Sequence, residues 1–230
     1  MTETIAQDKP TVVCVFCGAA AGYNEIHLEA ARSLARELHK NNVHLVYGGG
    51  TVGLMGELAK TLVSLSGPEA VHGIIPKALI RVEEGYQDKE SDSGSKKAER
   101  TVQNNGAEFG RVTVVPDMHS RKQLMAKQVF EGGPGSGFIA LPGGFGTMEE
   151  VMEMTTWNQL GIHHVGVLLL NINGYWNHLV AWVKNAVDEG FLSSQNASIL
   201  IQTDDTAAAL EKLGAYQVSG DRLELSWGDE

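Results

Sequence analysis

Apolar and polar positions follow two alternating patterns along this chain. Short apolar runs, often β-branched, predict buried strands at residues 11–16, 43–47, 70–75, 111–115, 137–141 and 165–170. Between them, apolar residues recur every three or four positions. This second pattern predicts helices at residues 24–40, 54–66, 118–131, 175–189 and 206–213, and another that opens near residue 147. A short apolar piece at residues 199–202 lies between the last two helices.

Strands buried on both faces and separated by helices of this length predict a parallel sheet with right-handed crossovers. The expected fold class is therefore α/β, a Rossmann-like doubly wound parallel sheet. With 230 residues, the chain can bury one full core, so we expect a single domain at residues 11–214. Residues 1–10 are expected to be a flexible N-terminus, and residues 215–230 a C-terminal tail.

One stretch interrupts the alternation of strands and helices. Residues 82–106 are polar, mixed in charge and almost without large apolar side chains. This composition favours a solvated or disordered insertion loop over a packed element. A lid over a binding pocket is the alternative interpretation.

Three of the predicted strands end in glycine turns, at residues 18–22, 48–53 and 143–146. In doubly wound folds, ligands bind outside the carboxyl ends of the strands. The three turns should therefore meet at one edge of the sheet and form a pocket large enough for a nucleotide.

The third turn has the layout of a phosphate cradle. Gly143, Gly144 and Gly146 allow the backbone to approach a ligand closely, and Thr147 adds a hydroxyl donor. The unpaired N–H groups and the positive dipole end of the following helix favour an anion. Thr147 and Glu150 also fit a capping box, in which each satisfies the other's backbone donor and nothing is bound. The sequence leaves both interpretations open.

The second turn matches the G-x-G-x-x-G pattern of dinucleotide-binding proteins. That function needs an acidic residue about 20 positions further on, at the end of the next strand. The next strand ends in HGIIP at residues 72–76 and has no carboxylate there, so the match is weak evidence. No glycine turn is followed by the Lys and Ser or Thr of a phosphate-binding P-loop.

Two basic residues, Arg121 and Lys122, follow the strand that ends at residue 115. They lie at the start of a helix, where the helix dipole opposes cations, and could simply be solvated there. Their position after a strand's carboxyl end also places them at the edge with the glycine turns, where Arg can grip phosphate or a purine with two hydrogen bonds.

Charge and composition narrow the class of partner. The net charge is −10 and the pI about 5.3, so we expect binding to neither nucleic acid nor an anionic membrane. No segment is long and apolar enough for a membrane span, and residues 1–10 lack the pattern of a secretory signal, so a cytoplasmic protein is expected. Cys14 and Cys17 are expected on opposite faces of a strand, and the eight histidines show no metal-ligand spacing. We therefore expect no metal and no cofactor.

Several motifs in order resemble the LOG (Lonely Guy) family, the cytokinin riboside 5′-monophosphate phosphoribohydrolases. They are YGGGTVGLMG at residues 47–56, IIPKAL at 74–79, MHSRK at 118–122, PGGFGTMEE at 142–150 and TWNQLGIHH at 156–164. The resemblance covers residues 12–191 and implies hydrolysis of the N-glycosidic bond of a nucleoside 5′-monophosphate. The products would be the free base and ribose 5-phosphate, and the protein would be at least a homodimer with its site near the subunit interface.

The resemblance also implies which residues act. Arg121 and Glu150 would be the catalytic pair. The residues that fall at the family's substrate-contacting positions are Lys122, Gly144, Phe145, Gly146, Thr147, Met148, Glu149 and Thr156, and Glu83 falls where a further acidic contact is expected. From the glycine turns themselves, we expect Gly18, Gly49, Gly50 and Gly143 to line the substrate pocket as well. The chain departs from the family pattern at Ser120, where an acidic or amide residue is frequent, and at Ala19 and Ala20, where serine is frequent.

Physical chemistry separates the roles of the two catalytic candidates. N-glycoside cleavage passes through an oxocarbenium-like state, which a carboxylate near the anomeric carbon can stabilise while it orients or deprotonates water. With Glu150 in the first turn of its helix, the dipole favours the ionised form, so we expect a base or an electrostatic stabiliser. Arg121 can stabilise negative charge on the leaving purine. The alternative function is an AMP-binding sensor module without hydrolysis, which would need neither residue.

Overall fold

A computed structural model of the chain describes residues 9–80, 106–223 and 225. These residues contain one seven-stranded sheet in the order β4-β3-β2-β1-β5-β6-β7, with every neighbouring pair parallel. The strands are β1 (Val12–Phe16), β2 (His44–Tyr47), β3 (Val71–Pro76), β4 (Arg111–Val115), β5 (Gly137–Ala140), β6 (Val167–Leu170) and β7 (Leu200–Thr203). The predicted α/β, doubly wound parallel fold is confirmed.

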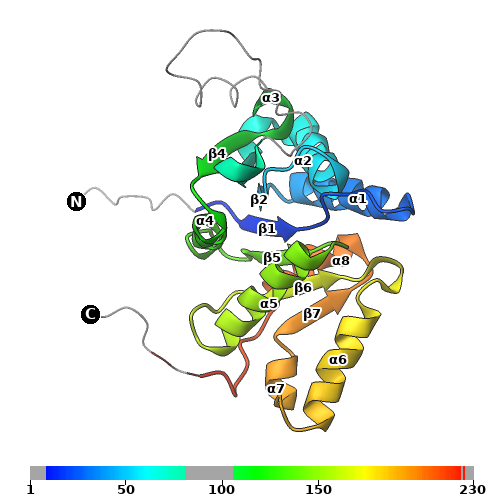
Figure 1. Cartoon of the computed structure of the whole chain (residues 1–230), viewed down its shortest axis with the longest axis vertical. Helices are drawn as coiled ribbons and strands as arrows, with labels where there is room; N and C mark the ends of the chain where they lie inside the picture. The colour runs from blue at the N-terminus through cyan, green and yellow to red at the C-terminus, as the bar shows by residue number, and fades with distance from the viewer. Residues whose placement is uncertain (1–8, 81–105, 224, 226–230) are drawn as a thin grey trace, which may run out of the picture.

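Helices cover both faces of the sheet (Figure 1). The α-helices are α1 (Ile26–Lys40), α2 (Gly53–Ser66), α3 (Gly106–Phe109), α4 (Met118–Phe130), α5 (Phe145–Gln159), α6 (Asn177–Asp188), α7 (Ser194–Ala197) and α8 (Thr206–Gly214). There are also three short 3-10 helices in the described residues. They are η1 (Pro68–Ala70) between α2 and β3, η2 (Lys77–Leu79) after β3, and η3 (Ile172–Gly174) between β6 and α6. The core on one face includes side chains from α1, α2 and α8, and the core on the other includes side chains from α4 and α5.

The alternation of side chains along β1 divides the core into these two layers. Val13 and Val15 pack in the layer with α1 and α2, whereas Cys14 and Phe16 pack in the layer with α4 and α5. Cys17 lies in the first layer, so the two cysteines point to opposite faces as predicted, and both thiols are free. A strand buried on both faces explains the unbroken apolar run in the sequence.

Several element boundaries differ from the sequence-based prediction. The piece at residues 199–202 is the edge strand β7. The helix expected from residue 175 begins at Asn177, because η3 and a turn precede it. The helix expected to open near residue 147 begins at Phe145, two residues earlier. This last shift changes the environment of Glu150.

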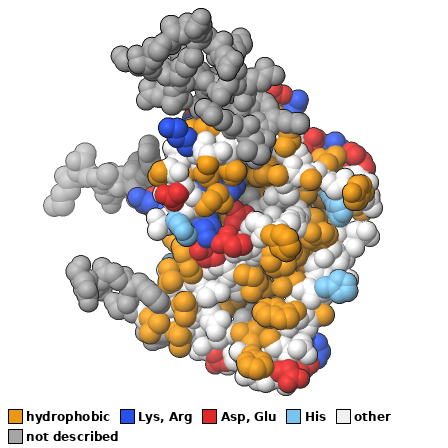
Figure 2. All heavy atoms as spheres, in the orientation of Figure 1, with side chains coloured by type: hydrophobic (Ala, Val, Ile, Leu, Met, Phe, Trp, Pro, Cys, Tyr) orange, Lys and Arg blue, Asp and Glu red, His pale blue; other side chains and the backbone are white. Residues whose placement is uncertain are grey.

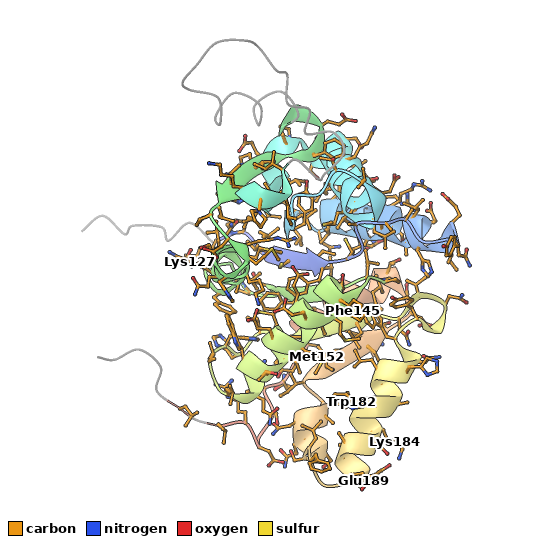
Figure 3. The ribbon with its side chains drawn as sticks, in the orientation of Figure 1. Lys127, Phe145, Met152, Trp182, Lys184 and Glu189 are labelled. Atoms are coloured by element: carbon orange, nitrogen blue, oxygen red, sulfur yellow. The ribbon has the colours of Figure 1, made fainter. Side chains whose placement is uncertain are left out.

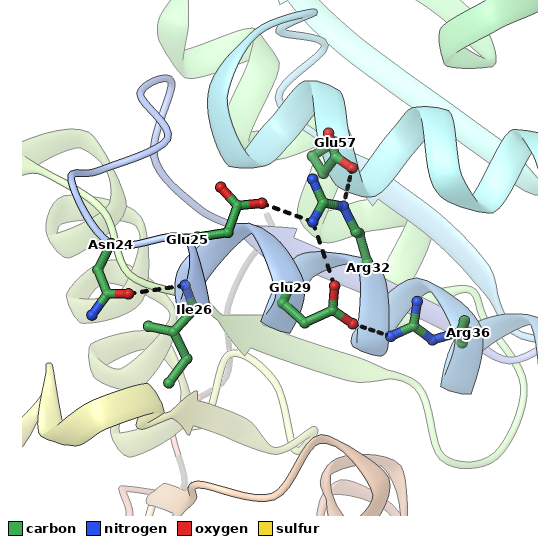
Figure 4. A network of polar contacts seen from close by, with 7 residues as sticks. All are labelled: Asn24, Glu25, Ile26, Glu29, Arg32, Arg36 and Glu57. Carbon is green, nitrogen blue, oxygen red and sulfur yellow. Dashed lines mark hydrogen bonds and ion pairs between the residues drawn. The ribbon is translucent and has the colours of Figure 1, made fainter.

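On one face, α1 and α2 are joined at the surface by a network of charged side chains (Figure 4). Arg32 of α1 contacts Glu25 and Glu29 of its own segment and Glu57 of α2. Arg36 also pairs with Glu29. The network links the two helices but lies at the solvent boundary, where ion pairs contribute little to stability.

Nearly all of the predicted insertion at residues 82–106 lies outside the described residues, as do residues 1–8 and, within the predicted C-terminal tail, residues 224 and 226–230. Within the described ranges, none of the helices combines the length and the apolar character that a bilayer span requires.

Candidate active site

The three glycine turns meet at the carboxyl edge of the sheet, as expected. In the sheet, β1 lies beside β5, and the order of the strands reverses between these two. Doubly wound folds bind their ligands at such a reversal. At this point the Gly18 N–H donates to the Pro142 carbonyl at 3.0 Å. The first and third turns are therefore joined directly by backbone hydrogen bonding.

The N-terminus of α2 is already occupied by the protein itself. The Gly18 carbonyl accepts hydrogen bonds from the N–H groups of Leu54 at 3.1 Å and Met55 at 3.4 Å. Gly53, with φ +61°, brings the backbone so close to Ala19 that a Cβ there would lie 2.3 Å from the Ala19 carbonyl oxygen. These contacts satisfy two of the donors that an anion would otherwise use at the second turn.

The second turn instead receives the guanidinium group of Arg121. A Cβ on Gly48 would lie 1.7 Å from Nη2 of Arg121, so only glycine leaves room for this side chain. Arg121 comes from α4 and donates from Nε to the Ile74 carbonyl of β3 at 3.2 Å. One arginine thus spans the ends of β2 and β3.

The third turn is open. Gly144 caps α5 without any side-chain hydrogen bond, and its carbonyl accepts from the Met148 N–H at 3.0 Å. The described parts of the chain offer no acceptor to the N–H groups of Phe145, Gly146 and Thr147 in the first turn of α5. A Cβ on Gly144 or on Gly146 would meet nothing within 4 Å. The start of α5 therefore keeps free donors and open space, which suits an anion.

The capping-box interpretation of Thr147 and Glu150 is wrong. Thr147 is the third residue of α5, not its cap, and its side chain packs against Gly143, where a Cβ would lie 2.1 Å from the Thr147 hydroxyl oxygen. Glu150 is the sixth residue of α5 and is buried. Because α5 begins two residues before Thr147, neither Thr147 nor Glu150 is at the position that a capping box requires.

Glu150 lies in the second turn of α5 and faces Arg121. The carboxylate oxygen Oε1 is 3.7 Å from Nη1 of Arg121, and Glu150 is only 7% exposed. Burial raises the pKa of Glu150 to about 7, while the neighbouring Arg121 acts in the opposite direction. Burial therefore outweighs the helix dipole, which was expected to favour the ionised form, because the group lies deeper in the protein than its first-turn assignment implied.

Lys122 has a different environment from Arg121. Its ammonium group contacts the carboxylates of Glu149 and of Glu153 on α5, and its side chain is 11% exposed. Figure 2 shows acidic and basic side chains gathered where α4 and α5 adjoin. Two carboxylates offset the charge of Lys122, so Arg121 is the cation that points toward the glycine turns.

The remaining predicted substrate contacts differ from one another in exposure and in position. Gly49 and Gly50 are buried in the second turn, and Met148 is half-buried on α5. Phe145 is 96% exposed at the rim of the third turn, as Figure 3 shows. Thr156 is exposed further along α5, toward the C-terminal end of that helix, and Glu83 lies outside the described residues.

Sequence reasoning missed Tyr175, whose hydroxyl donates to the Gly143 carbonyl of the third turn. Tyr175 follows η3 at the carboxyl end of β6. That position was available as a signal, since the strand at residues 165–170 was predicted to end at the same edge. Because the sequence-based prediction started a helix at residue 175, it did not identify Tyr175 as a residue of the loop at this edge.

Comparisons with known proteins identify a matching family model and several relatives of the chain. A family model described as "Possible lysine decarboxylase" matches residues 55–213. The chain is 47% identical over 224 residues to the "Bifunctional cytokinin biosynthesis protein" of Fusarium pseudograminearum, covering 97% of this chain and 44% of that protein. It is 39% identical over 209 residues to "Cytokinin riboside 5'-monophosphate phosphoribohydrolase LOG5" of Arabidopsis thaliana, covering 91% of this chain and 79% of that protein.

Among solved structures, the Moco carrier protein of Chlamydomonas reinhardtii superposes with a TM-score of 0.56. It is 19% identical and covers 89% of this chain and 98% of that chain. At this level of identity, the likeness supports the fold alone. The chain spans less than half the length of the Fusarium protein, so the second activity implied by that protein's name is not attributed to this chain.

Proposed function

The chain belongs to the LOG family of cytokinin riboside 5′-monophosphate phosphoribohydrolases, and from this we propose that it hydrolyses the N-glycosidic bond of N6-substituted AMP. The products are the free cytokinin base and ribose 5-phosphate. The observation that carries the proposal is a buried carboxylate, Glu150, on the same helix as an open anion cradle and ion-paired with Arg121. The description of the matching family model names a different reaction, but the relatives named above favour the phosphoribohydrolase activity.

The 5′-phosphate binds at the start of α5. The free N–H groups of Phe145, Gly146 and Thr147 and the helix dipole supply the attraction, which an acidic chain cannot supply through its overall charge. Glu150 lies five residues beyond Phe145, a rise of about 7.5 Å along the helix axis. One pentose ring with its 5′-carbon can bridge that distance. A phosphate held at the cradle therefore positions the sugar against Glu150.

Glu150 acts on the water and on the developing positive charge. Its pKa of about 7 lies close to physiological pH, where a general base combines a useful ionised fraction with a strong affinity for the proton. As the bond to the base breaks, the ionised carboxylate stabilises the oxocarbenium-like sugar and takes a proton from the attacking water.

Arg121 acts on the leaving base. Its guanidinium is fixed by the Ile74 carbonyl and by the space over Gly48, so it does not have to reorganise during the reaction. The guanidinium can offset the negative charge that develops on the purine, which leaves with the electron pair of the broken bond and takes its proton from solvent. The fixed position adds to the effect, because electrostatic stabilisation is strongest when the charge is already in place.

We also propose that the protein is a homodimer or a higher homo-oligomer. Large apolar side chains are exposed on two helices: Phe145 at the start of α5, beside the cradle, and Trp182 on α6 at 54% exposure (Figure 3). Figure 2 shows apolar side chains spread over α5 and α6 on the same face. An apolar surface next to a binding site is the kind of face that a second subunit covers.

The test is incubation of the protein with N6-isopentenyl-AMP, followed by chromatography for free base. Unsubstituted AMP and the riboside without phosphate are the comparison substrates. Release of base from the monophosphate, together with weak or absent release from the riboside, is the expected result. Tight binding of the monophosphate with no release of base would favour the sensor module and overturn the proposed reaction.

A further inference from the structure

The segment between β6 and α6 is a rigid turn that lies against the third glycine turn. Asn173 and Gly174 both adopt left-handed backbone angles, with φ 52° and φ 69°. The side chain of Asn171 accepts a hydrogen bond from the Trp176 N–H at 2.7 Å and donates one to Asn177 at 2.8 Å. These bonds close the turn on itself around Tyr175, which is 44% exposed.

Two side chains of this turn bind the segment that leads into the phosphate cradle. Trp176 is almost completely buried, and its Nε1 donates to the Ala140 carbonyl at the end of β5 at 3.3 Å. The hydroxyl of Tyr175 donates to the carbonyl of Gly143. The tyrosine ring also packs edge-on against Trp176 and against His27 of α1. Tyr175 is thus held from two sides while its hydroxyl fixes one peptide group.

That peptide group joins Gly143 to Gly144 and is the one most able to rotate in this loop. Both flanking residues are glycines, so no Cβ restricts the backbone angles on either side. In a trans peptide the carbonyl and the following N–H point in opposite directions. A hydrogen bond that fixes the Gly143 carbonyl toward Tyr175 therefore fixes the Gly144 N–H away from it.

We propose that Tyr175 is a positioning residue that sets the affinity of the cradle for the substrate's 5′-phosphate by locking the Gly143–Gly144 peptide. The proposal rests on the proposed function, because it assigns the phosphate to this turn. In the locked orientation the Gly143 carbonyl dipole is turned to Tyr175 and is neutralised by its hydroxyl. In the flipped orientation the same carbonyl oxygen would face the anion and repel it.

The test compares Tyr175→Phe with the wild type and with a matched control, Tyr216→Phe. The control also removes one tyrosine hydroxyl hydrogen bond, from Tyr216 to the side chain of Asn158 at 3.0 Å. Tyr216 packs on Gly166, just before β6 begins, which is the opposite edge of the sheet from the cradle. Any general effect of losing such a bond should appear in both variants.

The measurements are the Kd for ribose 5-phosphate by calorimetry and kcat/KM for N6-isopentenyl-AMP and for its riboside. In Tyr175→Phe, we expect the Kd to rise and the monophosphate kcat/KM to fall by about 2- to 12-fold, the range for one net hydrogen bond. Turnover of the riboside should stay unchanged. Tyr216→Phe should lower the melting temperature without changing either the Kd or the preference for the monophosphate.

Wild-type affinity and phosphate preference in Tyr175→Phe would overturn the proposal. Equal losses in both variants would overturn it as well, because the effect would then be loss of stability. If the wild-type protein released no base, the proposed reaction would be wrong, and the ribose 5-phosphate affinities would still decide the role of Tyr175.

Discussion

Substitution of Glu150 by Gln should increase stability at alkaline pH while it removes activity. Burial raises the pKa of this carboxyl from 4.5 to about 7 in the folded protein. One pKa unit corresponds to about 1.4 kcal/mol, so keeping the ionised group buried costs roughly 3 kcal/mol of folding free energy. Glutamine has nearly the same shape and carries no charge, so the variant avoids this cost.

The direction of this pH dependence follows from the pKa of Glu150 in the unfolded chain, 4.5, and in the folded protein, about 7. Between pH 4.5 and about 7 the folded state holds a proton that the unfolded state has released, so stability falls as pH rises through this window. The loss is complete above the folded pKa. Wild type and Glu150→Gln should therefore have similar free energies of unfolding near pH 4.5, and the variant should be more stable by up to about 3 kcal/mol near pH 8.

Urea denaturation at both pH values, on both proteins, measures this difference directly. The rate of base release from the same preparations should fall by about 10²- to 10⁴-fold in the variant, the usual contribution of a general base. A stability difference that stays constant between the two pH values would refute the burial argument. A fully active glutamine variant would refute the catalytic role.

Three further outcomes are expected. Arg121→Lys should lower kcat by about 100-fold in steady-state assays, because an ammonium group lacks the planar fork that reaches Ile74 and Glu150 together. His163 is buried and its pKa is lowered to about 4, so the folded state disfavours its charged form, and stability should fall by roughly 3 kcal/mol as pH drops from 6.5 to 4; His163→Gln should flatten this acid limb in a denaturation series. Arg32→Ala should leave the midpoint of unfolding in urea titrations nearly unchanged, because its three acidic partners meet it at the solvent boundary, where ion pairs contribute little to stability.

The sequence predicted what depends on local pattern. The unbroken apolar run of β1 and the glycines after β5 follow from periodicity and turn chemistry, and both lie where they were expected. The start of α5 was misplaced by two residues, because Gly144 caps it through the backbone and leaves no side-chain signal. Because of that small error, the sequence placed Glu150 in the first turn of the helix, whereas it is a buried residue of the second turn.

Contacts between distant elements could not be predicted from such patterns. The pairing of Lys122 with Glu149 and Glu153 depends on how α4 packs beside α5, and the room for Arg121 depends on Gly48 of another turn. Tyr175 reaches the cradle only because η3 interrupts the expected helix. The family resemblance named Arg121 and Glu150, but it contained no information on their burial.

The place of β1 at the centre of the sheet has a consequence for synthesis of the chain. One edge of β1 pairs with β2, where Val13 lies opposite Leu45, but the other edge pairs with β5, where Val13 lies opposite Gly137. At ordinary translation rates the intervening chain takes on the order of ten seconds to emerge. During that time the nascent protein carries an apolar strand with an unpaired edge, a template for association with other chains. Added chaperones, which cover such an edge during synthesis, should therefore raise the yield of folded protein more than substitutions on the surface of the folded protein.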